Sequence, residues 1–283
     1  MSLATKCMIV DVRVSKYNGY KTDKAASNKL TREANAQAGS AVVNKRVVPK
    51  EALEAITTAY NALKAHRDRH TLPWSDKGPR IMTRNIFELF MSGYGELERQ
   101  FNDAVDEFIT VKYPPVRDQA AFRLGDLFNE RDYPPPEELR KKFSVNLDID
   151  GITEPEDFRI ALPEAELNKL KQTMEESINR RLGDAMQDVW LRIAELLEHY
   201  IEKMEDDEAI FRDSTVNNLI ELMNILPGLN VTGDPKLREI RQRIMNTIGS
   251  YEPDDLRKGG DLRAAAAKEA KEIRESINEH VKG

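Results

Sequence analysis

The stretch PEAELNKLKQTMEESINRRLGDAMQDVWLRIAELLEHYIEKME, residues 163–205, decides the fold because no proline follows its first residue and its apolar side chains recur regularly. The average spacing is about 3.7 residues, which is the period of a nearly straight α-helix. At a rise of 1.5 Å per residue, such a helix would be about 65 Å long. The recurring positions are Leu167, Leu170, Met174, Ile178, Leu182, Ala185, Val189, Ile193, Leu196, Tyr200 and Met204.

The second half of this helix is more apolar than the first, because Met186, Trp190, Leu197 and Ile201 add a second stripe. We therefore expect a narrow packing seam in the first half and a core in the second half. Residues 209–226 carry a similar apolar pattern and end at Pro227-Gly228, so they predict an antiparallel partner helix. The two together predict a long helical hairpin.

After the hairpin, Asp234-Pro235 is a helix start signal for a further helix. The last segment, 260–283, is a strong helix former whose apolar stripe is only one residue wide, so we expect a marginal, detachable docking helix. Three consecutive domains are predicted on this basis: a mixed α/β region with a basic head at 1–162, the hairpin and following helix at 163–258, and the C-terminal helix at 259–283. The narrow stripe consists of Leu262, Ala266, Ile273, Ile277 and Val281.

The region before the long helix mixes strands and helices. Residues 6–16 alternate apolar and polar side chains, which predicts a half-buried strand, and 41–48 is a second β-prone run. Residues 143–160 alternate around a glycine-containing turn and predict a β-hairpin. The fold class is therefore mainly α with a small antiparallel β element (α+β), elongated and built round the helical hairpin. Further segments are read as a loop or weak helix (17–40), helices (49–70, 85–112 and a shorter one ending near 128) and a turn (71–80).

Charge is distributed unevenly along the chain. Residues 1–80 carry 15 Lys and Arg against 7 Asp and Glu, a net charge of +8, whereas the remainder carries 28 against 42, a net charge of −14. A basic end on an acidic body indicates a partner of opposite charge, either nucleic acid or the acidic body of a neighbouring copy. Two tyrosines among these cations, Tyr17 and Tyr20, are candidates for stacking on bases. The predicted binding cations are Lys16, Lys21, Lys24, Lys29, Arg32, Lys45 and Arg46. A solvated, disordered arm is the alternative interpretation of this segment.

Two patterns in the sequence resemble metal sites. His66 and His70 lie four residues apart on a predicted helix, a spacing that suits zinc, but two ligands do not make a site and the pair also fits a helix C-terminus. A second pattern resembles a calcium loop, although it ends in Asp rather than Glu and contains Pro155. These departures favour solvent-facing acids at a hairpin end. That pattern comprises Asn146, Asp148, Asp150, Gly151 and Asp157.

Catalytic motifs are missing from the sequence. There is no nucleophile elbow and no phosphate loop, and Cys7 has no histidine near it in sequence. We therefore expect a non-enzymatic protein without a cofactor. The N-terminal apolar run is interrupted by Asp11 and Arg13, so neither a signal peptide nor a membrane partner is expected, and the expected location is cytoplasmic.

Three blocks of sequence carry a family resemblance: LPWSDKGPRIMTRNIFELF (72–90), RLGDLFNERDYPPPEELRKKFSVNLDIDGI (123–152) and DFRIALP (157–163). They resemble an uncharacterised family borne mainly by bacteriophages and prophages, over most of residues 5–205. The resemblance implies a mostly helical phage-type protein that acts in the host cytoplasm, with no assigned activity or residue roles.

Two functions follow as hypotheses. The first is a binding or assembly protein whose basic N-terminal segment engages single-stranded or duplex nucleic acid, or docks head-to-tail on another copy to give a homo-oligomer. The second is an adaptor or inhibitor that presents its helices to a phage or host protein complex, such as an AAA-type ATPase or a defence complex. Deletion of residues 260–283 separates the two, because only the second hypothesis needs the last helix.

Overall fold

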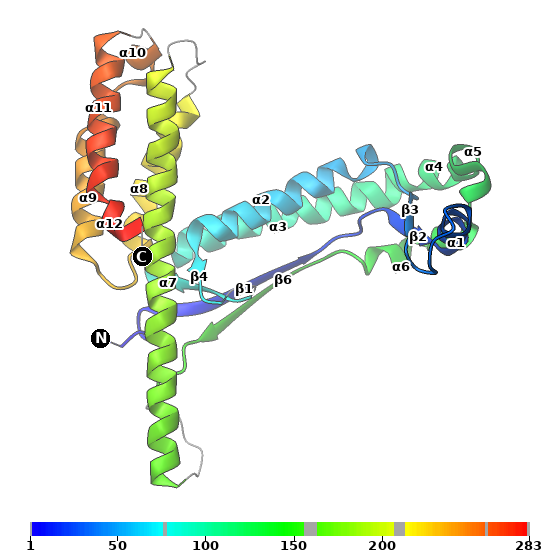
Figure 1. Cartoon of the computed structure of the whole chain (residues 1–283), viewed down its shortest axis with the longest axis horizontal. Coiled ribbons are helices and arrows are strands. Elements are labelled where there is room, and N and C mark those ends of the chain that lie inside the picture. Colours follow the sequence, from blue (N-terminus) through cyan, green and yellow to red (C-terminus); the bar gives the residue numbers. More distant parts are fainter. Residues whose placement is uncertain (1, 76–77, 156–162, 207–212, 258–259, 282–283) are drawn as a thin grey trace. The chain divides into compact units, whose positions relative to one another are not determined.

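The computed structural model describes residues 2–75, 78–155, 163–206, 213–257 and 260–281 (Figure 1). The chain is mainly α-helical with a small antiparallel β element, as predicted. The strands are β1 (Cys7–Ser15), β2 (Tyr20–Asp23), β3 (Val43–Arg46), β4 (Leu72–Pro73), β5 (Arg80–Thr83) and β6 (Ser144–Gly151). The helices are α1 (Lys24–Glu33), α2 (Glu54–His70), α3 (Phe87–Glu107), α4 (Tyr113–Asp118), α5 (Ala120–Leu124), α6 (Pro136–Arg140), α7 (Glu164–Glu205), α8 (Asp213–Leu229), α9 (Pro235–Asn246), α10 (Pro253–Arg257), α11 (Asp261–Ser276) and α12 (Asn278–Val281).

The chain forms two compact units that interleave along the sequence. Unit 1 comprises Met1–Asp11, Arg67–Phe90 and Asp148–Gly283, and unit 2 comprises Val12–His66 and Met91–Leu147. The chain passes between the units four times, within β1, α2, α3 and β6. These units differ from the three consecutive domains expected from sequence, because the contacts that define a unit join segments far apart in the chain.

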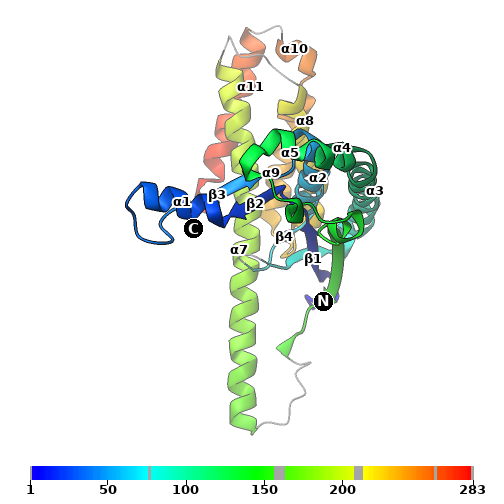
Figure 2. The ribbon, with the colours of Figure 1, turned by 90° about the vertical axis from the view of Figure 1, so that its right-hand side faces the viewer.

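Unit 1 contains a four-helix bundle. Helix α7 packs against α8 and α11, and α9 packs against the same two helices, so the four form a closed ring of neighbours (Figures 1 and 2). The predicted start signal of α9 is confirmed, since the Asp234 carboxylate caps the helix by accepting from the Lys236 N–H at 2.8 Å. Pro227 lies inside α8 instead of ending it.

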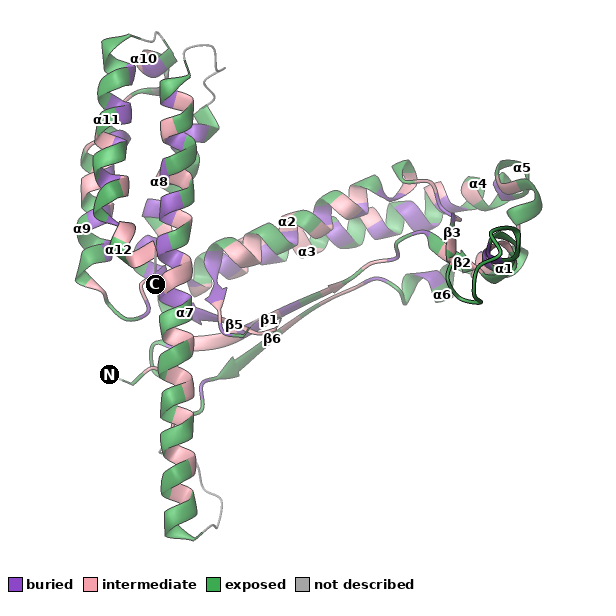
Figure 3. Ribbon diagram, viewed as in Figure 1, coloured by how far each residue is buried: buried purple, intermediate pink, exposed green. Residues whose placement is uncertain are grey.

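The two halves of α7 differ as predicted. No residue before Ala185 is buried, whereas the second half supplies much of the core of unit 1 (Figure 3). The second apolar stripe is the reason, because it allows neighbours to pack on more than one side of the helix. The buried residues of α7 are Ala185, Met186, Val189, Trp190, Ile193, Ala194, Leu197, Tyr200 and Met204.

The last long helix, α11, belongs to this core. Ala266, Ala270 and Ile273 are fully buried, and α11 packs on both α7 and α9. Arg263 is also buried and donates to the carbonyl oxygens of Lys203 and Asp206 at the C-terminal end of α7. Leu262, expected in the stripe, is instead 38% exposed. The predicted stripe leaves out Ala267 and Ala270, which are also buried, and small alanine side chains permit close helix packing. These contacts give no support to a detachable helix.

The main sheet has the strand order β4-β5-β1-β6. In the antiparallel pairing of β1 with β5, Cys7 lies opposite Thr83 and Val10 opposite Arg80. Two expectations need correction. Residues 71–80 are not only a turn, since they contain β4 and the start of β5. Residues 144–151 form one strand beside β1, and the expected return strand with Phe158 and Ile160 lies outside the described residues.

Unit 2 is built on parts of α2 and α3, which run side by side (Figures 1 and 2). Their apolar faces are buried, with Ile56 and Leu63 from α2 and Phe101 and Val105 from α3. The helical conformation does not end at the prolines after Tyr113, because Phe108–Lys112 form a π-helical turn that leads directly into α4. A proline is tolerated in the first turn of a helix, where its missing N–H would be unpaired in any case.

No described helix combines the length and the apolar character that crossing a membrane requires.

Candidate functional site

The predicted basic segment folds as two paired strands joined by a connection that contains a helix. Strands β2 and β3 pair antiparallel with α1 between them, and α1 begins at Asp23, whose side chain accepts from the Ala26 N–H at 2.9 Å. The expected loop or weak helix at 17–40 is therefore partly ordered structure. An aspartate cap at position 23 is the sequence signal that would have predicted the start of this helix.

Five of the predicted cations have exposed or partly exposed side chains, and we call this set the cationic surface: Lys21, Lys24, Lys29, Arg32 and Arg46. Lys24, Lys29 and Arg32 are exposed on α1, and Lys21 and Arg46 are partly exposed on the two strands. Within the described part of the chain, Lys29 alone among them has a carboxylate partner, Glu33 at 3.9 Å. Their positive charge is therefore largely uncompensated.

An aromatic ring shares the face of the β2–β3 pair that carries Arg46, whereas Lys21 lies opposite Lys45 on the other face. Tyr20 lies opposite Arg46 in the strand pairing, and the Arg46 guanidinium carbon lies 4.2 Å from the centre of the Tyr20 ring. Tyr20 remains 40% exposed. A cation held over a ring in this way pre-positions two planar groups at the edge of the β2–β3 pair.

Lys45 does not belong to the cationic surface, because its side chain points inwards. Its Nζ lies 3.0 Å from Asp23 Oδ2 and 2.9 Å from Asp132 Oδ2, and donates to the Leu127 carbonyl at 2.6 Å. Burial by itself would lower the pKa of Lys45, but the two carboxylates outweigh it and raise the pKa. Lys45 therefore joins the β2–β3 pair to the segment after α5, a role in folding.

Two more predicted residues are occupied by packing. Lys16 Nζ lies 4.5 Å from the centre of the Tyr60 ring and 3.3 Å from Thr57 Oγ1, both on α2. Tyr17 is buried, so it is not available to stack on a base.

The histidines predicted as metal ligands pack against α3. The His66 ring covers Gly93, and His70 is buried with its ring edge-on to Phe90 at 6.4 Å. Among the described residues, no three His, Cys, Asp or Glu side chains cluster closely enough to hold a metal ion. Asn146, Asp148 and Asp150 lie on strand β6, and Asp157 of the calcium-like pattern lies outside the described residues.

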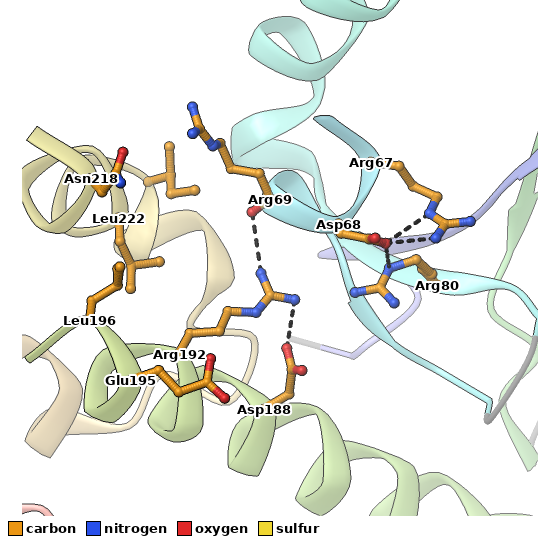
Figure 4. Close-up of a pocket in the computed structure, with 11 residues that line it drawn as sticks. Arg67, Asp68, Arg69, Arg80, Asp188, Arg192, Glu195, Leu196, Asn218 and Leu222 are labelled. Atoms are coloured by element: carbon orange, nitrogen blue, oxygen red, sulfur yellow. Dashed lines mark hydrogen bonds and ion pairs between the residues drawn. The ribbon is translucent and has the colours of Figure 1, made fainter. Parts of the chain in front are cut away.

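A pocket of about 680 Å³ lies in unit 1 between the end of α2, strand β5 and helices α7 and α8 (Figure 4). We call it the arginine pocket, because Arg67, Arg69, Arg80 and Arg192 line it. Leu196, Leu222 and Ile225 form an apolar wall on α7 and α8. No sequence pattern predicts this pocket, since its residues come from four separate segments. Asp68, Asp188, Glu195 and Asn218 complete the lining.

Most arginines of this pocket form hydrogen bonds or ion pairs with other residues of the chain. Arg192 donates to the carbonyls of Arg69 and Thr71, which end α2, and pairs with Asp188 at 2.6 Å. A cation at a helix C-terminus is favourable because the carbonyl end of the helix is partly negative. Two further ion pairs, each 2.8 Å long, are Arg67–Asp68 and Arg69–Glu221.

This arrangement forms hydrogen bonds and ion pairs but contains no nucleophile paired with a base. The lining residues of the arginine pocket include no Cys, His, Ser or Lys. Elsewhere in unit 1, burial raises the pKa of Cys7 to about 11, so its thiol stays protonated near neutral pH.

The chain matches no protein-family model, no curated protein and no solved structure. The phage-type family suggested by the three sequence blocks therefore stays a prediction.

Proposed function

We propose that the protein binds single-stranded nucleic acid through the cationic surface on β2, α1 and β3. The observation that supports this most strongly is the uncompensated charge of Lys24, Arg32 and Arg46, together with the exposed Tyr20 ring that Arg46 covers. Phosphate groups supply most of the affinity in such complexes, and lysine and arginine bind them without reading the base sequence.

The aromatic component favours a single strand over a duplex. The face of a base is accessible in a single strand and is covered by its neighbours in a duplex. Tyr20 and the planar Arg46 guanidinium offer surfaces on which a base stacks, and stacking of this kind tolerates any base. We therefore expect the protein to bind single strands of any base sequence and to prefer them over duplexes.

Fluorescence anisotropy with a labelled oligothymidylate of about 20 nucleotides tests the proposal. If all five cations contact phosphates, the logarithm of the association constant falls against the logarithm of the salt concentration with a slope of roughly −3.5. The triple reversal K24E/K29E/R32E changes exposed residues only, so the fold should persist and affinity should fall roughly 30-fold.

A matched control is available in unit 1. The triple reversal K169E/R238E/K268E changes three exposed residues and alters the net charge by the same amount. It should retain most of the affinity if the cationic surface is the binding site. Equal losses in both triple variants, or a wild-type affinity that does not change with salt, would refute the proposal.

Self-association through the same surface is the other outcome that the test can reveal. Light scattering at low and high salt, without nucleic acid, measures it. A particle mass that falls with salt and with K24E/K29E/R32E, with no binding of the oligonucleotide, would assign the cationic surface to an acidic neighbour instead.

A further inference from the structure

A second pocket in unit 1 has a different charge balance from the arginine pocket. It has a volume of about 550 Å³. Three arginines and one aspartate line it, together with three uncharged residues: Arg80, Arg180, Arg181, Asp184, Pro73, Trp74 and Ser75. Three guanidinium groups therefore face one carboxylate. We call it the tryptophan pocket, and it is independent of the cationic surface, which belongs to unit 2.

Two of the three guanidinium groups of the tryptophan pocket, those of Arg180 and Arg181, form fewer hydrogen bonds and ion pairs than the arginines of the arginine pocket. Arg180 is exposed on α7 and forms no ion pair with any residue that the structure describes. Arg181 lies over Trp74, with its guanidinium carbon 5.4 Å from the ring centre. A guanidinium stacked on a ring keeps the N–H groups at its edge free to donate.

Arg80 stands between the two pockets and lines both. Its Nε and Nη2 donate to Thr71, at 2.6 Å to Oγ1 and 3.0 Å to the carbonyl oxygen, which fixes the plane of the guanidinium. Its carboxylate neighbour Asp68 is 3.6 Å away. Burial lowers the pKa of Arg80 from its ordinary value, against the effect of Asp68, and the nearby Arg192 lowers it further. An anion beside this guanidinium would relieve both effects.

We propose that the tryptophan pocket binds a small anion with two or more phosphoryl groups. Arginine suits this ligand because its planar fork donates two parallel hydrogen bonds to phosphate oxygens. Arg80 is held in place by Thr71 and Arg181 by the Trp74 ring, so two of the three donors are positioned before binding. A volume of about 550 Å³ exceeds what a single phosphate fills and lies within the range of small-molecule sites.

Isothermal titration calorimetry of the full chain with sodium tripolyphosphate measures the proposed binding directly. Citrate is the reference ligand, because it carries several negative charges on planar carboxylates and has no phosphoryl group. We expect tripolyphosphate to bind at least tenfold more tightly than citrate. Equal affinity for the two ligands, or no heat of binding with tripolyphosphate, would refute the proposal.

Two variants and one control locate the binding. R180Q removes an exposed guanidinium without disturbing packing and should weaken tripolyphosphate binding about tenfold, and R180Q/R181Q should weaken it about a hundredfold. R99Q in α3 is the control, because Arg99 is exposed and its partners are Glu96 and Asp103 in unit 2. An unchanged affinity in R180Q/R181Q would overturn the assignment. ATP as a second ligand distinguishes a nucleotide from an inorganic polyphosphate, since additional affinity over tripolyphosphate would come from the nucleoside.

Because K24E/K29E/R32E leaves the tryptophan pocket intact, that variant should bind tripolyphosphate like the wild type. The two proposals can therefore fail separately.

Discussion

The imidazole ring of His66 lies directly against Gly93, so closely that a Cβ atom at position 93 would come within 2.3 Å of His66 Cε1. This contact explains why α3 tolerates a glycine in its interior. It also gives His66 a packing role, because its ring lies against the neighbouring helix.

Gly93→Ala should destabilise the protein by about 1–2 kcal/mol, because the overlap with His66 outweighs the better helix propensity of alanine. Gly95→Ala is the matched control, since a Cβ atom there would meet nothing within 4 Å. That control should stabilise the protein by up to about 1 kcal/mol. Urea unfolding followed by circular dichroism measures both changes, and two changes of the same sign would contradict the packing argument.

Lys45→Met should destabilise the protein by about 3 kcal/mol, because it leaves the carboxylates of Asp23 and Asp132 together without their cation. Lys29→Met is the control, since Lys29 is exposed and only loosely paired. Its free energy of unfolding should stay within about 0.5 kcal/mol of the wild type. A Lys45→Met variant as stable as the control would show that the cluster is not structural.

The same cluster should make stability fall in acid. The Ala26 N–H first, and then Lys45, hold the pKa of Asp23 below its ordinary value of 3.8. A depressed carboxyl pKa contributes stability above the unfolded-state value, and this contribution is lost as the pH falls through the folded-state value. The loss should therefore lie below about pH 4.

Asp23→Asn tests this pH dependence, because asparagine still caps α1 but does not titrate. Its urea midpoint should change less than that of the wild type between about pH 4.5 and pH 2.5. Identical acid profiles for the variant and the wild type would remove Asp23 as the cause.

At the alkaline end, the raised pKa of Lys45 predicts a loss of stability only above pH 10.5.

Arg263→Met should destabilise the protein by about 2 kcal/mol, since Arg263 is buried and donates to the Lys203 and Asp206 carbonyls that end α7. Leu262→Gln is the control on the exposed neighbour and should change stability by less than about 0.5 kcal/mol. Hydrogen exchange should show lost protection in α11 for the first variant alone. Wild-type protection in both variants would mean that α11 does not depend on this contact.

Tyr200→Phe should stabilise the protein by about 1 kcal/mol, because the Tyr200 hydroxyl is buried without a hydrogen-bond partner in the described part of the chain. Tyr113→Phe should have the opposite effect and a similar size, because the Tyr113 hydroxyl donates to the Pro134 carbonyl at 2.8 Å. Thermal unfolding of the two variants compares them, and a loss of stability in Tyr200→Phe would indicate an acceptor for its hydroxyl.

Local patterns in the sequence determine the main helices and several strands. The spacing from Leu167 to Met204 predicts the extent of α7, and Asp234-Pro235 predicts the start of α9, because a helical period and an N-cap depend only on residues close in sequence. The charge asymmetry likewise identifies the segment that carries the cationic surface.

Only the tertiary structure decided which charges are available and where pockets lie. The sequence does not distinguish Lys45 from Lys29, yet one is buried between two carboxylates and the other faces solvent, because Asp132 lies far from both along the chain. The arginines of the two pockets come from α2, β5 and α7, so their proximity depends on packing between distant segments. Burial and ion pairing are long-range properties, and no local period encodes them.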